Sequence, residues 1–210
     1  MKDFGLYVVM TDPVVGYERC CEAAVKAGVR MVQLRMKDKP RDEIVSVANG
    51  CRSITRNSGT MFIVNDDPSI AAEVGADGVH VGQDDMPVAD VRRLYPSIGI
   101  IGLSTHNLKQ AIASENAHPD YIGVGPVYAT PTKKIPDPVL GVASAARMID
   151  MVEVPAVAIG GMTVDTIPSM ILAGARNIAV VRPVCQSPDP YSVIVDLQRT
   201  IEAALERAAK

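Results

Sequence analysis

Two pairs of aspartates follow two short apolar segments of this chain, and carboxylates at such positions are ligands for hard cations. Asp66 and Asp67 follow the first segment. Asp84 and Asp85 follow the second, after a short amphipathic stretch. So compact a strand–helix–strand unit predicts two neighbouring parallel strands, which would bring the carboxylates together at the strand ends. Because carboxylates placed side by side repel one another without a cation, and hard oxygen ligands suit Mg²⁺, we expect a Mg²⁺ site there.

One aspartate of each pair also has an interpretation as a helix cap. Asp67 precedes Pro68, and Asp followed by Pro is a typical helix start, which leaves Asp66 as the strand-end carboxylate. In the second pair, either Asp84 or Asp85 could cap the helix expected to begin at Pro87. The pair alone therefore does not say which of its members binds metal.

The elements that must position these residues are eight strand–helix units of similar length. The predicted strands are Gly5–Thr11, Met31–Met36, Met61–Asn65, Gly78–Val81, Gly99–Ser104, Tyr121–Val127, Ala156–Ile159 and Asn177–Val181. The predicted helices are Tyr17–Ala27, Arg41–Asn57, Pro68–Val74, Pro87–Tyr95, Leu108–Asn116, Val142–Met151, Val164–Ala173 and Pro190–Ala208. The strands are nearly continuous Val/Ile/Leu runs, as expected of parallel strands covered on both faces. Glycines 28, 75 and 174 follow helices directly before strands, as helix C-caps do.

This even repeat predicts an α/β fold, a (β/α)₈ TIM barrel that forms one domain over residues 1–210. A doubly wound open sheet is the alternative, and the evenness of the repeat disfavours it. In a barrel of this kind the active site lies at the carboxyl ends of the strands, so we expect the aspartates at its mouth.

Polar and apolar residues alternate at the end of the second predicted strand. Gln33, Arg35 and Lys37 are separated by Leu34 and Met36, so the three polar side chains share one face. In a closed barrel that face points into the lumen near the mouth. The alternative is that these residues form the solvent-exposed face of an edge strand. It is disfavoured because predicted strands lie on both sides of this one. Two cations and an amide suit a polyanion such as diphosphate.

Three more polar side chains lie at or near strand ends. Ser104 ends the fifth predicted strand, where it could bind an oxyanion or a polar ring. His80 lies within the fourth, and a hydrogen-bonded interior histidine is at least as good an interpretation as a catalytic one. His106 is expected in the following loop or first helical turn.

Two later connections have the composition of anion-binding loops. Residues 128–138 form a long βα connection with hydroxyls and lysines that favour phosphate, although a solvated loop is a serious alternative for Lys134. Gly160-Gly161 and Val181-Arg182 follow the last two strands, whose free backbone N–H groups commonly bind phosphate in such barrels. Two anion sites and a metal site at one mouth predict an enzyme that joins two phosphorylated fragments and releases diphosphate.

Composition excludes several other classes of protein. A net charge of −3 does not attract nucleic acids or anionic membranes. No apolar run is long enough to span a membrane. The four cysteines have no zinc-ligand spacing, so we expect reduced, mostly buried thiols in a cytoplasmic protein. A predicted strand follows the first residues at once, so no signal peptide is expected. The sequence leaves the oligomeric state open, a homo-oligomer included.

The combined motifs resemble thiamine phosphate synthase, and the resemblance covers nearly the whole chain. The matching segments are residues 33–37, Asn65-Asp66, residues 78–85, residues 102–106, Gly125-Pro126-Val127-Tyr128, Thr130-Pro131-Thr132-Lys133 and Ile159-Gly160-Gly161-Met162. The resemblance implies hydroxymethylpyrimidine diphosphate and thiazole phosphate as substrates, Mg²⁺ as cofactor, and thiamine phosphate and diphosphate as products. It also implies a dissociative reaction in which no side chain acts as nucleophile.

The resemblance assigns roles to single residues. It implies Asp66 and Asp85 as Mg²⁺ ligands, with Asp84 as a flanking residue. For the pyrimidine diphosphate it implies Gln33, Leu34, Arg35, Met36, Lys37, Asn65, Ser104 and Lys133. For the thiazole phosphate it implies Thr130, Pro131, Thr132, Gly161, Val181 and Arg182. Among these, Arg35, Lys37, Ser104 and Lys133 are the expected catalytic residues.

One position departs from the family pattern, which often has serine where this chain has Arg182. We therefore expect the backbone of Gly161 and Val181 to contribute more than the Arg182 side chain. Two alternatives are a thiazole tautomerase of the same fold and a non-catalytic phosphate-binding barrel. The presence of both Asp66 and Asp85 argues against the tautomerase, and the full set of cations and carboxylates argues against the non-catalytic barrel.

Overall fold

The computed structural model describes residues 3–131 and 137–209. Within these ranges eight parallel strands form a closed barrel in the order β1-β2-β3-β4-β5-β6-β7-β8. The strands are β1 (Leu6–Met10), β2 (Met31–Leu34), β3 (Met61–Asn65), β4 (Gly78–Val81), β5 (Ile100–Thr105), β6 (Tyr121–Val124), β7 (Ala156–Ala158) and β8 (Asn177–Val180). Because β1 pairs with both β2 and β8, the sheet has no edge. The predicted barrel is confirmed.

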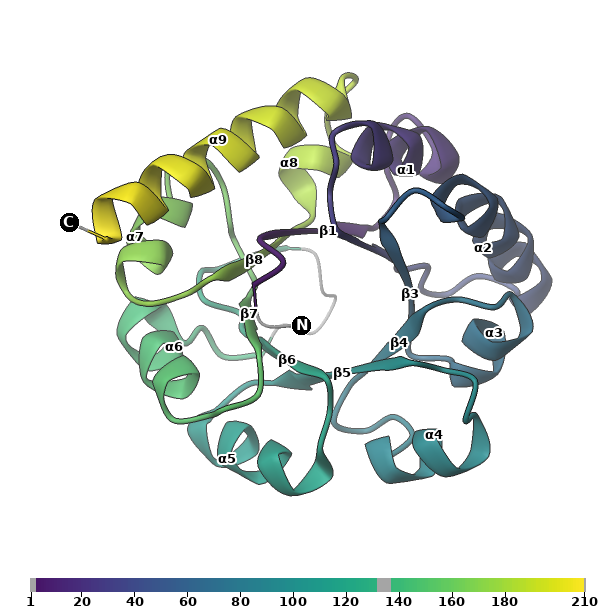
Figure 1. Cartoon of the computed structure of the whole chain (residues 1–210), viewed down its shortest axis with the longest axis horizontal. Coiled ribbons are helices and arrows are strands. Elements are labelled where there is room, and N and C mark those ends of the chain that lie inside the picture. The colour runs from purple at the N-terminus through teal and green to yellow at the C-terminus, as the bar shows by residue number, and fades with distance from the viewer. Residues whose placement is uncertain (1–2, 132–136, 210) are drawn as a thin grey trace.

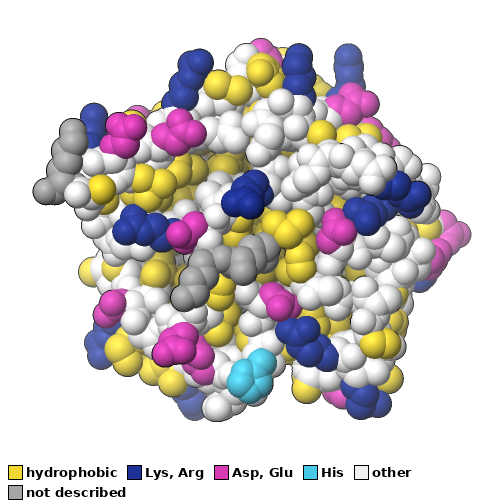
Figure 2. All heavy atoms as spheres, in the orientation of Figure 1, with side chains coloured by type: hydrophobic (Ala, Val, Ile, Leu, Met, Phe, Trp, Pro, Cys, Tyr) yellow, Lys and Arg dark blue, Asp and Glu magenta, His cyan; other side chains and the backbone are white. Residues whose placement is uncertain are grey.

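Helices form the outer ring and strands the inner ring (Figure 1). The helices are α1 (Tyr17–Lys26), α2 (Arg41–Thr55), α3 (Pro68–Glu73), α4 (Val88–Leu94), α5 (Leu108–Ala117), α6 (Gly141–Asp150), α7 (Ile167–Leu172), α8 (Arg182–Cys185) and α9 (Pro190–Ala208). None of those in the described ranges has the length and hydropathy of a membrane crossing. Acidic and basic side chains are interspersed on the face shown in Figure 2.

The period of two along each strand divides the core into two clusters. In β1, Leu6, Val8 and Met10 pack outward against the helices, whereas Tyr7 and Val9 point into the lumen. The lumen cluster is small and partly aromatic, with Phe4, Tyr7 and Tyr121 among its members. Side chains therefore fill the lower part of the barrel, which leaves the mouth for ligands.

The predicted boundaries need two corrections near the last strands. α7 begins at Ile167 rather than Val164, because residues before it form a turn in which Thr163 N donates to Thr166 Oγ1 at 2.8 Å. The sequence prediction missed α8 altogether. This helix has four residues, too few to show a helical period, and Arg182 is its first residue.

Glycines end the helices where this was predicted. Gly28, Gly75 and Gly174 have φ angles of 73°, 65° and 106°, a backbone conformation that side chains disfavour. The four cysteines are free and buried, as predicted.

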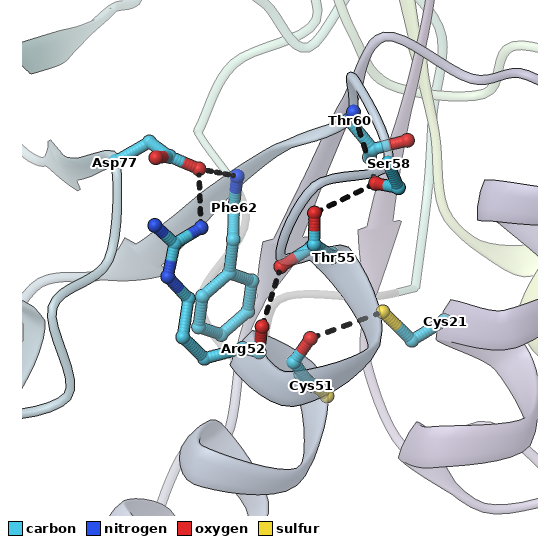
Figure 3. Close-up of polar contacts among 8 residues, drawn as sticks. All are labelled: Cys21, Cys51, Arg52, Thr55, Ser58, Thr60, Phe62 and Asp77. Carbon is cyan, nitrogen blue, oxygen red and sulfur yellow. Dashed lines mark hydrogen bonds and ion pairs between the residues drawn. The ribbon is translucent and has the colours of Figure 1, made fainter.

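A polar cluster fixes the start of β3 against α2 and the loop before β4 (Figure 3). Asp77 Oδ2 accepts hydrogen bonds from Arg52 Nη1 at 2.9 Å and from Phe62 N at 2.8 Å. Thr55 and Ser58 continue the cluster at the end of α2, with hydroxyl-to-carbonyl bonds to residues three positions earlier. These contacts set the height of β3 in the barrel, and therefore the place where Asp66 leaves the strand.

Asp67 caps α3, as predicted. Its Oδ1 accepts hydrogen bonds from Ser69 N at 2.8 Å and from Ile70 N at 3.1 Å. No aspartate of the second pair caps α4, whose N-cap is Pro87 without a side-chain hydrogen bond. The capping interpretation is thus confirmed for Asp67 and wrong for Asp84 and Asp85.

Replacing Asp67 with alanine is expected to lower the free energy of unfolding by about 1 kcal/mol, because two N–H groups of α3 lose their acceptor. Asp67→Asn retains an acceptor and should recover most of this loss. Urea unfolding of both variants measures the difference. An alanine variant as stable as the parent would show that the cap contributes nothing.

Candidate active site

A cavity of about 1070 Å³ opens at the carboxyl ends of the strands. The predicted site residues that line it are Gln33, Arg35, Lys37, Asn65, Asp66, Asp85, Ser104, Thr130, Pro131, Gly161, Val181 and Arg182. Leu34 and Met36 do not line it, because their side chains are buried in the outer core. Thr132 and Lys133 lie outside the described residues.

Asp66 and Asp85 come together at one side of the cavity, as the two strand ends predict. Asp66 has a φ of 65°, and its N–H donates to the His80 carbonyl at 2.7 Å, which turns the chain at the end of β3. The Asp66 carboxylate forms an ion pair with Lys37. On the other strand, Gly82 N donates to Asp85 Oδ2 at 2.6 Å and fixes that carboxylate.

The electrostatics at Asp85 indicate a place for a cation. Burial raises the pKa of Asp85, and the neighbouring Asp66 carboxylate raises it further. The Gly82 N–H and the Lys37 ammonium act in the opposite direction and lower it. A divalent cation beside the two carboxylates would offset the charge that disfavours ionised Asp85.

The donor set fits Mg²⁺ in particular. The described residues contain no group of three or more His, Cys, Asp or Glu side chains arranged for a metal. Mg²⁺ is usually held by one or two carboxylates together with substrate phosphates and waters. A pair of carboxylates beside Arg35 and Lys37 in one cavity is a donor set of that kind.

The opposite side of the cavity is backbone-rich. Gly160 and Gly161 have φ angles of 99° and 66°, and a Cβ on Gly161 would lie 2.6 Å from Tyr128 Cβ. Val181 is the N-cap of α8, and Val181, Arg182 and Pro183 line the cavity. The absence of side chains at the two glycines lets the loop after β6, with Pro126 and Tyr128, pack against the chain after β7.

Comparisons with known proteins show the family of the chain. A family model described as thiamine monophosphate synthase matches residues 6–184. The chain belongs to the thiamine monophosphate synthase family. Enzymes of this family are transferases, and this chain is an enzyme of that class.

Relatives cover nearly the full length of the chain. It is 39% identical over 202 residues to the thiamine-phosphate synthase of Laribacter hongkongensis, covering 94% of this chain and 95% of the relative. It is 38% identical over 206 residues to that of Methanoregula boonei, covering 96% and 95%. A solved thiamine phosphate pyrophosphorylase from Pyrococcus furiosus superposes with a TM-score of 0.88 at 29% identity, covering 96% of this chain and 97% of that structure.

The sequence analysis missed several residues of this thiamine monophosphate synthase site. Tyr7 and Tyr121 line the cavity floor, and His106, Gln83 and Asp137 line its wall. The period of two along the first strand places Tyr7 on the same face as Val9, but that Val9 is the register partner of Gln33 is seen only in the structure. His80 is hydrogen-bonded inside the barrel, as predicted for an interior histidine, and it also lines the cavity. His106 lies in the loop after β5, as predicted.

Proposed function

We propose that this enzyme transfers the hydroxymethylpyrimidine group from its diphosphate to thiazole phosphate, giving thiamine phosphate and diphosphate. The observation that supports the proposal is one cavity with two sides of different composition. One side has Arg35, Lys37 and two carboxylates, which suit a metal-bound diphosphate. The other has the glycines after β7 and the backbone after β8, which suit a monophosphate.

Asp66 and Asp85 would hold Mg²⁺ in this reaction. When bound, the ion supplies positive charge that neutralises the leaving diphosphate. Lys37 forms an ion pair with Asp66, so this carboxylate has a positive charge beside it. If Mg²⁺ replaces Lys37 at Asp66, the carboxylate stays paired and the ammonium group is available to the diphosphate.

The side chains of the cavity would position the reactants and stabilise charge. Arg35 and Lys37, together with Lys133, would bind the diphosphate as the carbon–oxygen bond breaks. Gln33, Asn65 and Ser104 would hold the pyrimidine ring, whose amino group stabilises the cationic methylene carbon. The thiazole nitrogen would capture that carbon, held near it by Thr130, Thr132, Gly161, Val181 and Arg182 around its phosphate. Such a dissociative reaction depends on positioning and needs no nucleophilic side chain.

Incubation of the purified protein with both substrates and Mg²⁺ tests the proposal. We expect thiamine phosphate and diphosphate to form in equal amounts, and both to disappear when chelator replaces Mg²⁺ or when either substrate is omitted. Formation of product in excess chelator would contradict the metal assignment alone. No thiamine phosphate under any of these conditions would contradict the proposed function.

A further inference from the structure

A continuous row of hydrogen bonds crosses the cavity floor through five side chains from five strands. Gln33 Nε2 donates to Tyr7 Oη at 2.7 Å, and Tyr7 Oη lies 2.9 Å from Tyr121 Oη. Tyr121 Oη lies 3.0 Å from His80 Nδ1, and His80 Nε2 lies 2.9 Å from Ser104 Oγ. The two ends of the row, Gln33 and Ser104, are the side chains proposed above to contact the pyrimidine ring.

The two phenols in the middle of the row each keep one hydrogen. Tyr7 is 2% exposed and Tyr121 is fully buried. Burial raises the pKa of both phenols well above the ordinary value, so neither ionises near neutral pH. Each hydroxyl therefore donates one hydrogen bond, and a buried hydroxyl hydrogen without an acceptor would be costly.

This condition gives the row one direction. The amide of Gln33 donates to Tyr7, so the Tyr7 hydrogen must go to Tyr121 Oη. Tyr121 then donates to His80 Nδ1, which leaves the ring hydrogen on Nε2. His80 Nε2–H therefore donates to Ser104 Oγ. The Ser104 hydrogen is left to point into the cavity that the residue lines.

The surrounding rings hold the row in place. Phe4, Tyr7 and Tyr121 contact one another edge to face, with centroid separations of 5.9–6.2 Å. His80 stacks on Tyr121 at 5.4 Å. Gly102 lies between His80 and Tyr121 in the strand register, and a Cβ there would overlap the Tyr121 hydroxyl. Because Gly102 has no side chain, the Tyr121 hydroxyl can reach His80 across β5.

We propose that Tyr7, Tyr121 and His80 are positioning residues that set the hydrogen-bond polarity of the ring-binding end of the cavity. They make the Ser104 hydroxyl a donor and turn the carbonyl oxygen of Gln33 toward the cavity as an acceptor. The ligand that fits this pattern is a heteroaromatic ring with an acceptor nitrogen and an amino donor. The identity of that ring rests on the proposed function, whereas the polarity of the row does not. The row orients hydrogens and transfers none.

The first test reads the ring hydrogen of His80 by ¹⁵N NMR, which distinguishes the two neutral tautomers from each other and from the doubly protonated ring. The chain has three histidines, so the spectra of His80→Gln and His106→Gln variants assign the signals. His106 supplies an internal reference, because its Nδ1 lies 2.7 Å from the Gly125 carbonyl, which only accepts. We expect hydrogen on Nε2 of His80 and on Nδ1 of His106. Hydrogen on Nδ1 of His80 would reverse the row and overturn the proposal.

The second test is a double-mutant cycle on turnover. Tyr121→Phe keeps the ring and should lower kcat/KM about tenfold, since a positioned hydrogen bond is lost. In a Ser104→Ala background the same change should cost about twofold or less, because Tyr121 acts through Ser104. Tyr7→Phe removes the acceptor of the Gln33 amide and leaves the Tyr121 hydrogen on His80, so its loss should shrink in a Gln33→Ala background instead. It provides a second variant if Tyr121→Phe folds poorly.

The matched control is Thr105→Val, which removes a neighbouring buried hydroxyl that bonds Gly123 O at 2.9 Å, outside the row. It should change stability but not kcat/KM, in either background. Equal losses from Tyr121→Phe with and without Ser104 would overturn the positioning role. The NMR result needs no turnover, so an inactive parent protein would contradict the proposed function and leave the polarity of the row to be decided by the spectrum.

Discussion

The Asp85→Ala variant is expected to turn over about a thousandfold more slowly than the parent at saturating substrates, with its fold intact. Asp85 is one of only two carboxylates that we place on the metal, and the Gly82 N–H holds it in place. Its loss would leave Asp66 as the single protein ligand, already paired with Lys37. Rates measured over a range of Mg²⁺ concentrations should show that added metal recovers only part of the loss.

Asp84→Ala is the matched control for this prediction. Asp84 is the neighbouring aspartate of the same loop. It lines the same cavity but is exposed, and it has no place in the proposed metal site. We expect less than about a threefold change in turnover, as for other exposed charges. Full turnover by Asp85→Ala, or equal losses in the two variants, would contradict the assignment of Asp85 as a ligand.

The location of the site was predictable from sequence because, in a barrel of this kind, the order of the strands along the chain determines which residues lie at the mouth. Eight apolar runs of similar spacing predict parallel strands, and parallel strands in a closed barrel end at one mouth. Residues at strand ends, such as Asp66, Ser104 and Gly161, are therefore expected to line one cavity, and they do. The alternation rule likewise placed Gln33 inside the lumen and Leu34 outside it.

What escaped prediction depends on contacts between distant strands. Nothing local to Tyr7 or Tyr121 shows that their hydroxyls meet, because 114 positions separate them. Asp84 and Asp85 have the same side chain in the same loop, so their spacing alone does not distinguish them. The family resemblance implies Asp85, and in the structure it is Asp85 that accepts a hydrogen bond from Gly82 N. Leu34 and Met36 belong to the matching motif but lie in the outer core, so a motif is wider than the set of side chains that can reach a ligand.

The Lys37→Ala variant is expected to lose about a hundredfold in kcat/KM, because a cation proposed to stabilise the leaving diphosphate is removed. In the structure Lys37 pairs with Asp66 on the side of the cavity where we propose the metal. Its loss would also leave the two carboxylates with less positive charge nearby. Lys37→Arg keeps the charge and should recover part of the activity, though its planar group suits a different geometry.

Lys39→Ala separates this effect from a general loss of positive charge. Lys39 lies two residues further along the same loop and pairs with Glu43 at 3.3 Å on the helix surface. Because exposed pairs of this kind contribute little, we expect kcat/KM within about twofold of the parent. Steady-state kinetics on the three variants decide the point. Similar losses for Lys37→Ala and Lys39→Ala would mean that the loop attracts the diphosphate by its net charge alone, and that the ion pair with Asp66 has no part in the reaction.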